Sequence, residues 1–156
     1  MPSPPPSEDV ASHINAAASD GWNAAMGVHF VRATADEVVV EWEVGPQHRQ
    51  PHGIVHGGVH AGVIETIASV GAALYARQLG LSVVGLENHT SFLRAVREGV
   101  LRATARPLTR GRRTQVWEGE IRDASGRIVA TGRVRLLALE PESTLAGETV
   151  GKPPAE

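Results

Sequence analysis

The chain has 156 residues, enough for one domain with a single hydrophobic core, and a formal net charge of −2. This charge gives no electrostatic case for binding nucleic acid, and the absence of cysteine excludes disulfides, thiolate metal sites and a cysteine nucleophile. The proline-rich start has neither a basic leader nor an apolar run, so no signal peptide is evident and we expect a cytoplasmic location.

Both ends are rich in residues that do not build a core. Residues 1–10 are dense in proline, and residues 140–156 are rich in Pro, Gly, Ser, Thr and Glu. We therefore expect a single domain at residues 11–139 between two disordered tails.

The predicted elements follow one another in a simple order. A short helix is expected around residues 10–26, and two strands at 28–34 and 37–44 are joined by a turn at Ala35 and Asp36. A loop rich in Gly, Pro and His then leads into a long apolar helix. Four further strands are predicted at residues 82–93, 100–108, 114–122 and 128–139, separated by short turns. This order predicts an α+β fold in which one long central helix is wrapped by a curved antiparallel sheet of about six strands.

The long helix carries an isolated carboxylate. From Gly57 to Ala76, Glu65 is the only formally charged side chain. A carboxylate in such a setting loses hydration unless it is hydrogen-bonded, paired or partly exposed, and such sites are where carboxylate reactivity is tuned. An ordinary glutamate at the helix edge, reaching solvent, is the alternative that the segment leaves open.

Helical spacing divides this segment into two faces. One face, expected to pack on the sheet, gathers Val59, Val63, Thr66, Ile67, Val70 and Leu74. The other face consists of Gly58, Ala61, Gly62, Glu65, Ser69 and Ala72. Because this second face is nearly free of side chains around Glu65, a slender ligand or a second subunit could approach closely.

Three other interpretations fit the sequence less well. The apolar run is long enough for a membrane span, but its glycines, His60 and Glu65 favour a buried helix, so no membrane association is expected. His48, His52, His56 and His60 recur every four residues, yet Pro51 and the glycines between them make one helix improbable, and no metal site is expected. A serine hydrolase is not expected, since no Gly-x-Ser-x-Gly motif occurs.

Four motifs together resemble a known family. They are the segment Gln50-Pro51-His52-Gly53-Ile54-Val55-His56-Gly57-Gly58, then Glu65 with Ser69, then Asn88-His89-Thr90-Ser91-Phe92, then Gly111-Arg112-Arg113-Thr114-Gln115-Val116-Trp117. In order and spacing the chain resembles the hotdog-fold acyl-CoA thioesterases, in the branch of the phenylacetate-pathway and Arthrobacter-type 4-hydroxybenzoyl-CoA thioesterases. The resemblance covers nearly all of the expected domain.

The resemblance implies catalytic roles for five residues. Glu65 would be the nucleophile or general base, and the backbone N–H of Gly57 would polarise the thioester carbonyl at a helix N-terminus. Gln50 would assist from the neighbouring subunit, Ser69 would orient the hydrolytic water, and His56 would be an orienting hydrogen-bond group rather than the base. The implied product is a free acid and coenzyme A, from an aromatic or medium-chain acyl-CoA.

The resemblance also implies how substrate and subunits are bound. Arg112 and Arg113, at a turn where relatives carry small hydroxylated residues, would contact the nucleotide phosphates together with Arg94, since arginine suits phosphate. The remaining residues assigned to substrate or coenzyme A binding are Gly58, Asn88, His89, Ser91 and Thr114. Coenzyme A is part of the substrate, so no separate cofactor is implied. Shared active sites imply a homodimer, and the family favours a homotetramer.

Two other functions remain open on the same fold. A hydratase or dehydratase acting on acyl-CoA would carry an Asp and His pair that this chain lacks, with Glu65 in its place. A non-catalytic acyl-CoA-binding protein would use Glu65 only for specificity. Thioester turnover separates both from a hydrolase.

Overall fold

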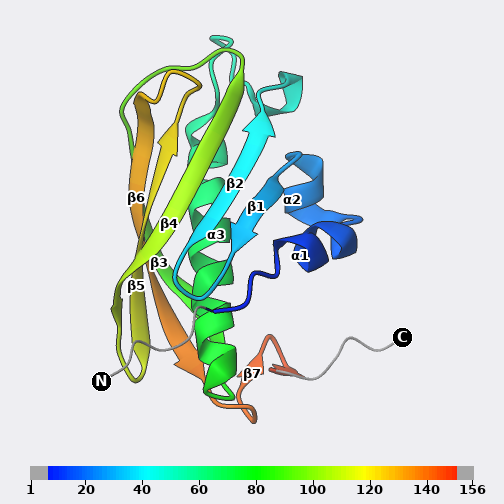
Figure 1. The fold of residues 1–156 in the computed structure, drawn as a ribbon, viewed down its shortest axis with the longest axis vertical. Helices are drawn as coiled ribbons and strands as arrows, with labels where there is room; N and C mark the ends of the chain where they lie inside the picture. Colours follow the sequence, from blue (N-terminus) through cyan, green and yellow to red (C-terminus); the bar gives the residue numbers. More distant parts are fainter. Residues whose placement is uncertain (1–6, 151–156) are drawn as a thin grey trace.

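A long helix lies against one face of a six-stranded antiparallel sheet in this computed structural model, which describes residues 7–150 (Figure 1). The helices are α1 (Ala11–Ala17), α2 (Gly21–Ala25) and α3 (Gly57–Gln78), with a 3-10 helix, η1, at Pro46–His48. The strands are β1 (His29–Ala33), β2 (Val38–Glu43), β3 (Ser82–Phe92), β4 (Val100–Arg110), β5 (Thr114–Arg122), β6 (Ile128–Leu139), β7 (Thr144–Leu145) and β8 (Glu148–Thr149). The sheet order is β1-β2-β4-β5-β6-β3, and β7 pairs only with β8. The predicted α+β hotdog architecture is confirmed.

The ends of α3 are set by its flanking residues. His56 is the N-cap, with extended backbone, and its Nδ1 accepts a hydrogen bond from the Gly58 N–H at 2.8 Å. At the other end Gly80 adopts a left-handed backbone with φ of 70°, which lets the Leu81 N–H reach the Ala76 carbonyl at 3.0 Å. The helix therefore has a fixed start, at the motif that the sequence singled out.

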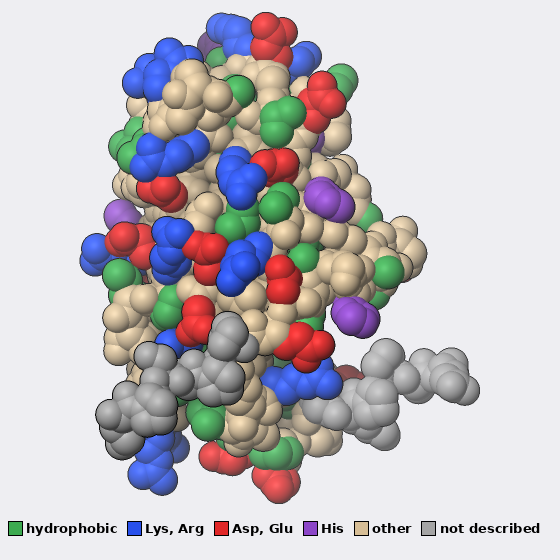
Figure 2. Space-filling view, in the orientation of Figure 1, with side chains coloured by type: hydrophobic (Ala, Val, Ile, Leu, Met, Phe, Trp, Pro, Cys, Tyr) green, Lys and Arg blue, Asp and Glu red, His purple; other side chains and the backbone are tan. Residues whose placement is uncertain are grey.

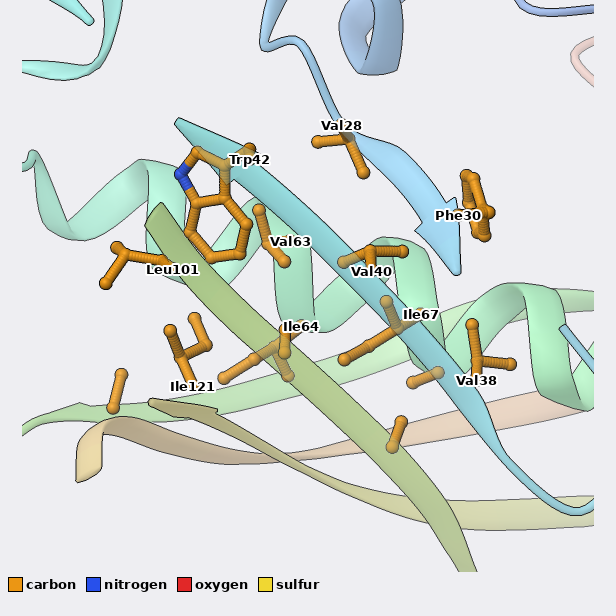
Figure 3. Close-up of a cluster of buried hydrophobic side chains, with 14 of the residues drawn as sticks. Val28, Phe30, Val38, Val40, Trp42, Val63, Ile64, Ile67, Leu101 and Ile121 are labelled. Carbon is orange, nitrogen blue, oxygen red and sulfur yellow. The ribbon is translucent and has the colours of Figure 1, made fainter. Parts of the chain in front are cut away.

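Glycines let α3 lie close to the sheet. Gly119 and Gly132 are paired across β5 and β6, and a Cβ on either would lie within 3.3 Å of the Ile64 side chain. On the helix itself, a Cβ on Gly71 would lie 2.4 Å from the ring of Trp117. The space that these residues leave is filled by Ile64 and Trp117, which are both fully buried members of the apolar core. Figure 3 shows Ile64 among its apolar neighbours.

The helix is rotated relative to the faces predicted from its spacing. Ile64, Ala68 and Gly71 are buried, and so is Ala72, which the sequence placed on the open face, whereas Thr66 and Val70 are only half-buried. The prediction is wrong here because α2 covers part of the helix as well, with Thr66 donating to the Asn23 side chain at 3.1 Å.

By length and mean hydropathy α3 could also cross a membrane, but half of that stretch is buried inside this fold.

The first predicted helix is instead two helices. Asp20 has extended backbone and Gly21 a φ of 81°, so the chain bends between α1 and α2.

The segments expected to be disordered tails are partly ordered where the structure describes them. Asp9 accepts hydrogen bonds from the Ala33 and Ala11 amides, which lower its pKa, and residues 144–149 form the β7–β8 hairpin. Residues 1–6 and 151–156 lie outside the described part.

The outer face of the sheet is covered by paired charges. Figure 2 shows Arg and Asp or Glu side chains interleaved over this face. The ion pairs include Arg102 with Glu41, Arg106 with Glu37, and Arg133 with Glu118. The opposite signs nearly cancel, so this face carries no extended field of one sign.

The two helix glycines provide a matched test of packing on α3. Gly71→Ala would push against Trp117, which is fully buried, whereas Gly62→Ala would meet Trp22, which is 42% exposed and can move. Overpacking costs roughly 1–3 kcal/mol, and alanine gains up to about 1 kcal/mol over glycine in a helix. We expect Gly71→Ala to lower the free energy of unfolding in urea and Gly62→Ala to leave it unchanged or raise it, at equal protein concentration. Equal effects at both sites would contradict the packing described.

His60 is a buried histidine without a hydrogen bond at one ring nitrogen. Its side chain is 3% exposed, and Nδ1 has no partner among the described residues. Burial lowers the pKa of His60 from 6.5 to about 4, because the charged imidazolium would lose its hydration. The folded protein therefore holds His60 neutral at a pH where the unfolded chain takes up a proton.

This difference predicts a loss of stability in acid. Since the folded pKa lies below the unfolded one, the contribution of neutral His60 is complete above about pH 6.5 and is lost as the pH falls towards about 4. Between pH 7 and pH 5 the wild type should lose about 2 kcal/mol more unfolding free energy than His60→Leu. Urea titrations at both pH values measure this, with exposed His13→Gln as control. Parallel losses in wild type and His60→Leu would show that His60 is not the group responsible.

Candidate active site

Glu65 lies on α3 at a point where a strand supplies its hydrogen-bond partners. The Asn88 side-chain amide on β3 donates to Glu65 Oε2 at 3.0 Å and to the Ala61 carbonyl at 2.9 Å. Ser69, one turn further along α3, donates to Glu65 Oε1 at a longer 3.4 Å. The carboxylate is half-buried and ordered by these donors. Such a group can act as a nucleophile or as a base towards a molecule that reaches it.

An open pocket of about 710 Å³ gives access to this carboxylate. Trp22 forms one wall, with its ring over Gly62, where an added Cβ would lie 2.5 Å from the indole. The other lining residues belong to the α1–α2 segment and to α3: Ile14, Ala17, Ala18, Asp20, Gly21, Asn23 and Thr66. Among the described residues that line it, Asp20 is the one charged group besides Glu65, so the pocket is apolar with an acidic edge.

The residues of the His-Gly-Gly motif line a different cavity. It measures about 500 Å³ and lies at the N-terminus of α3, where Gln50, His56, Gly57 and Gly58 meet Phe92 and Arg94. The Gly57 N–H has no hydrogen bond to any described residue, which leaves a donor at the positive end of the helix dipole. The Gln50 side chain accepts from the His52 N–H, and the His56 ring caps the helix. His56 thus supports the backbone around Gly57.

Gly57 and Glu65 are too far apart to meet one carbonyl group within a single chain. They are eight residues apart on one helix, which at about 1.5 Å per residue separates their backbones by about 12 Å. The sequence-predicted catalytic residues therefore form two sets in this chain. Gln50, His56 and Gly57 are brought together at the helix N-terminus, and Glu65 lies with Ser69 two turns further along.

The predicted substrate-binding residues on β3 divide between the two faces of the sheet. Asn88 points to α3, whereas His89 and Ser91 line a depression on the outer face beside Glu118 and Arg133. Successive side chains of a strand alternate in direction, so the consecutive motif could not all face Glu65. Within one chain His89 and Ser91 therefore lie away from Glu65, and their assignment to substrate or coenzyme A binding stays a prediction.

The three arginines assigned to coenzyme A lie at opposite ends of the sheet. Arg94 follows the end of β3 and lines the cavity at Gly57. Arg112, Arg113 and Thr114 are exposed near the other end, where the Arg113 carbonyl accepts from Ala138, the neighbour of Val83 at the start of β3. The 11 residues of β3 span about 35 Å at ~3.3 Å per residue, so one chain cannot direct all three arginines at one nucleotide.

The regularly spaced histidines have unrelated environments. His48 is buried in η1, where Nδ1 accepts from the Gly45 N–H at 2.8 Å and Nε2 lies 2.9 Å from the Met26 carbonyl oxygen. His56 is the N-cap and His60 is inside α3. No group of three or more potential ligand side chains is arranged for a metal in the described range.

Sequence reasoning missed three residues around Glu65. Trp22 is one of only six aromatic residues (Phe, Trp and Tyr) in the chain, and this rarity is the signal that could have identified it. The sequence analysis predicts one continuous helix there, which gives no reason to place Trp22 beside Glu65. Thr90 donates to Asn88 Oδ1 at 2.7 Å, and Gly85 would place an added Cβ 2.5 Å from Glu65 Oε1. Neither contact can be predicted without knowing how β3 packs against α3.

Comparison with known proteins identifies the family. The pattern of the family described as Thioesterase superfamily matches residues 52–130. The chain is 39% identical over 137 residues to Rv1847 of Mycobacterium tuberculosis, which carries the name "putative esterase", covering 86% of this chain and 96% of that protein. It is 37% identical over 109 residues to the proofreading thioesterase EntH of Cronobacter turicensis, covering 70% and 79%.

Solved structures agree with this assignment. The structure of Rv1847 superimposes with a TM-score of 0.74 at 42% identity, covering 76% of this chain and 95% of that one. Thioesterase HI1161 of Haemophilus influenzae superimposes with a TM-score of 0.78 at 30% identity, covering 83% and 90%. The fold, the motif at the start of α3 and the relatives lead to one conclusion: the chain belongs to the thioesterase superfamily and is a thioester hydrolase.

Proposed function

We propose that the protein is an acyl-CoA thioesterase in which Glu65 acts on the thioester of an aromatic or medium-chain acyl-CoA. The observation that carries the proposal is the half-buried Glu65 carboxylate, held by Asn88 and Ser69 at the edge of an open apolar pocket. Trp22 offers that pocket a flat apolar wall on which a ring or an alkyl chain can pack. The branch of phenylacetate-pathway and 4-hydroxybenzoyl-CoA thioesterases remains our more specific assignment.

Two routes lead from this carboxylate to the free acid and coenzyme A. As a nucleophile, Glu65 would attack the thioester carbonyl and expel the thiolate, and water would then cleave the resulting anhydride. As a general base, it would take a proton from water, which attacks the carbonyl directly, with Ser69 beside it. In both, negative charge develops on the carbonyl oxygen, where the free Gly57 N–H at a helix N-terminus is suited to stabilise it.

The second step of the proposal is that each site is shared between two subunits. Because about 12 Å separates Gly57 from Glu65 along α3, the two can act on one thioester only if they come from different chains. Gln50, in the cavity of Gly57, would then reach the substrate of the partner's carboxylate. This geometry is the reason that a homodimer is part of the proposed function.

The edge strand β3 is the surface best suited to that dimer. It pairs with β6 on one side only, so its other side presents unpaired backbone groups over 11 residues. Leu86 on this strand is exposed, and so are Phe92 and Leu93 at its end, each at 59%. Pairing of two β3 strands would cover these groups and bring the two helices side by side. A homotetramer of two such dimers is part of the same proposal.

Subunit sharing also gives the separated arginines a function. Arg94 of one chain and Arg112 and Arg113 of another would bind the coenzyme A phosphates, with Thr114, Gly58, His89 and Ser91 as further contacts. Coenzyme A enters as part of the substrate, so no separate cofactor is proposed. A cytoplasmic location without nucleic-acid or membrane partners completes the proposal.

Substitution of the carboxylate tests the proposed activity. Glu65→Gln keeps the shape but removes the negative charge and replaces one acceptor oxygen by an NH2 group, so thioester hydrolysis should fall by at least about 100-fold. The measurement is thiol release from a panel of aryl, medium-chain and short acyl-CoAs, with binding of a non-hydrolysable analogue as control for an intact site. Turnover within about threefold of wild type would exclude Glu65 as the reacting group.

Complementation tests whether sites are shared. Gln50→Ala and Glu65→Ala homodimers should each be inactive, whereas subunit exchange should restore activity, because one of the two sites in each mixed dimer would be intact. Exchange is verified by native mass spectrometry with differently tagged chains. If mixed dimers form without a gain in turnover, the shared geometry is wrong.

A further inference from the structure

We propose that Asn88, held in place by Thr90, is the positioning residue that fixes the Glu65 carboxylate, rather than a residue that binds substrate. The inference rests on the proposed function of Glu65. Its basis is a chain of three contacts from the sheet to the helix: Thr90 donates to Asn88 at 2.7 Å, and Asn88 donates to Glu65 at 3.0 Å and to the Ala61 carbonyl at 2.9 Å.

The amide of Asn88 can hold only one orientation in this chain. Its nitrogen faces two acceptors, Glu65 Oε2 and the Ala61 carbonyl, and its oxygen faces the Thr90 hydroxyl. Turning the amide over would place two oxygens against each other at Glu65 and leave the helix carbonyl without this donor. The two acceptors on α3 therefore select this orientation, and the Thr90 hydroxyl, which can donate or accept, holds the amide in it by donating to the Asn88 oxygen.

The local form of β3 fits this task. Asn88 and Thr90 are two residues apart and so share the face that packs on α3. The pairing of β3 with β6 shifts in register between Gly85 and Glu87. Gly85 leaves room for the carboxylate, since a Cβ there would lie 2.5 Å from Glu65 Oε1. One strand thus supplies both the donor for one carboxylate oxygen and the space for the other.

The consequence concerns the reaction rather than substrate affinity. Both polar ends of the Asn88 side chain are used by protein groups, and its nitrogen is already shared between two acceptors, so little capacity remains for a ligand. Oε2 is held by Asn88, whereas Oε1 has the longer contact from Ser69 and is the oxygen more available to react. Loss of Asn88 should let the flexible glutamate leave its reactive position, and misplacement by about 1 Å can cost about 100-fold in rate.

Three variants separate positioning from binding and from folding. Asn88→Ala should lower kcat about 100-fold and change KM less than about threefold. Thr90→Val removes the hydroxyl at nearly equal shape and should lower kcat about 10-fold, while Thr90→Ser, which keeps the donor, should recover most of it. Thr104→Val on β4, on the outer face of the sheet, is the matched control for loss of a strand hydroxyl, and thermal unfolding checks that all variants are folded.

Crystal structures of wild type and Asn88→Ala keep this inference independent of the proposed activity. In the variant, the Glu65 carboxylate should occupy a different rotamer or several. If wild-type protein hydrolyses no acyl-CoA, the proposed function fails, and the crystal structures still decide whether Asn88 positions Glu65. An unchanged Glu65 in the Asn88→Ala structure overturns the inference, as do a rise in KM that accounts for the whole kinetic loss and equal kcat values for Thr90→Val and Thr90→Ser.

Discussion

The close contact between α3 and the sheet determines where every other group of the site lies. Ile64 packs onto Gly119 and Gly132, and Gly71 lies against Trp117, so the helix is held at a short distance with little room to slide or rotate. Interiors packed in this way respond to changes as small as one methylene group. The position of Glu65, next to Ile64 on the same helix, is therefore a consequence of core packing. Its half-buried state follows from the same contact, since one side of the helix is against β3 and the other is open.

Within that constraint, the helix keeps its own two functional groups apart. An α-helix rises by a fixed amount per residue, and no side-chain movement brings the Gly57 N–H to the Glu65 carboxylate. A cavity forms at each position, one lined by Gln50 and His56 and the other by Trp22. The proposed site therefore needs groups from two chains, and the unpaired edge of β3 is the surface that we propose for their association.

Local patterns predicted the sheet more accurately than the side-chain directions. Strands β5 and β6 begin and end at the residues expected from the sequence, because turns rich in Gly, Arg and Asp delimit them. The helix over residues 10–26 was not predicted as two helices, since the extended backbone of Asp20 and the positive φ of Gly21 are visible only in the structure. The motif from Asn88 to Phe92 was located correctly along the chain, but alternation along a strand sends His89 and Ser91 to the face opposite Asn88. Likewise, the family resemblance assigns Arg94 and Arg113 to one nucleotide site, and only the sheet register shows that the length of β3 separates them.

The outer face of the sheet and its β3 edge differ in surface chemistry. Glu118 pairs with Arg133, and Glu41 with Arg102, on that face, and exposed ion pairs of this kind contribute about 0–1 kcal/mol each to stability. Their main effect is to keep the face hydrated, since covering it would remove water from many charges at once. Of the nine exposed large apolar side chains in the described part of the chain, three lie on or directly after β3: Leu86, Phe92 and Leu93. The strand that holds Glu65 through Asn88 is therefore also the one that has exposed apolar area beside free backbone groups, so that in the proposed dimer one element would serve both assembly and the geometry of the carboxylate.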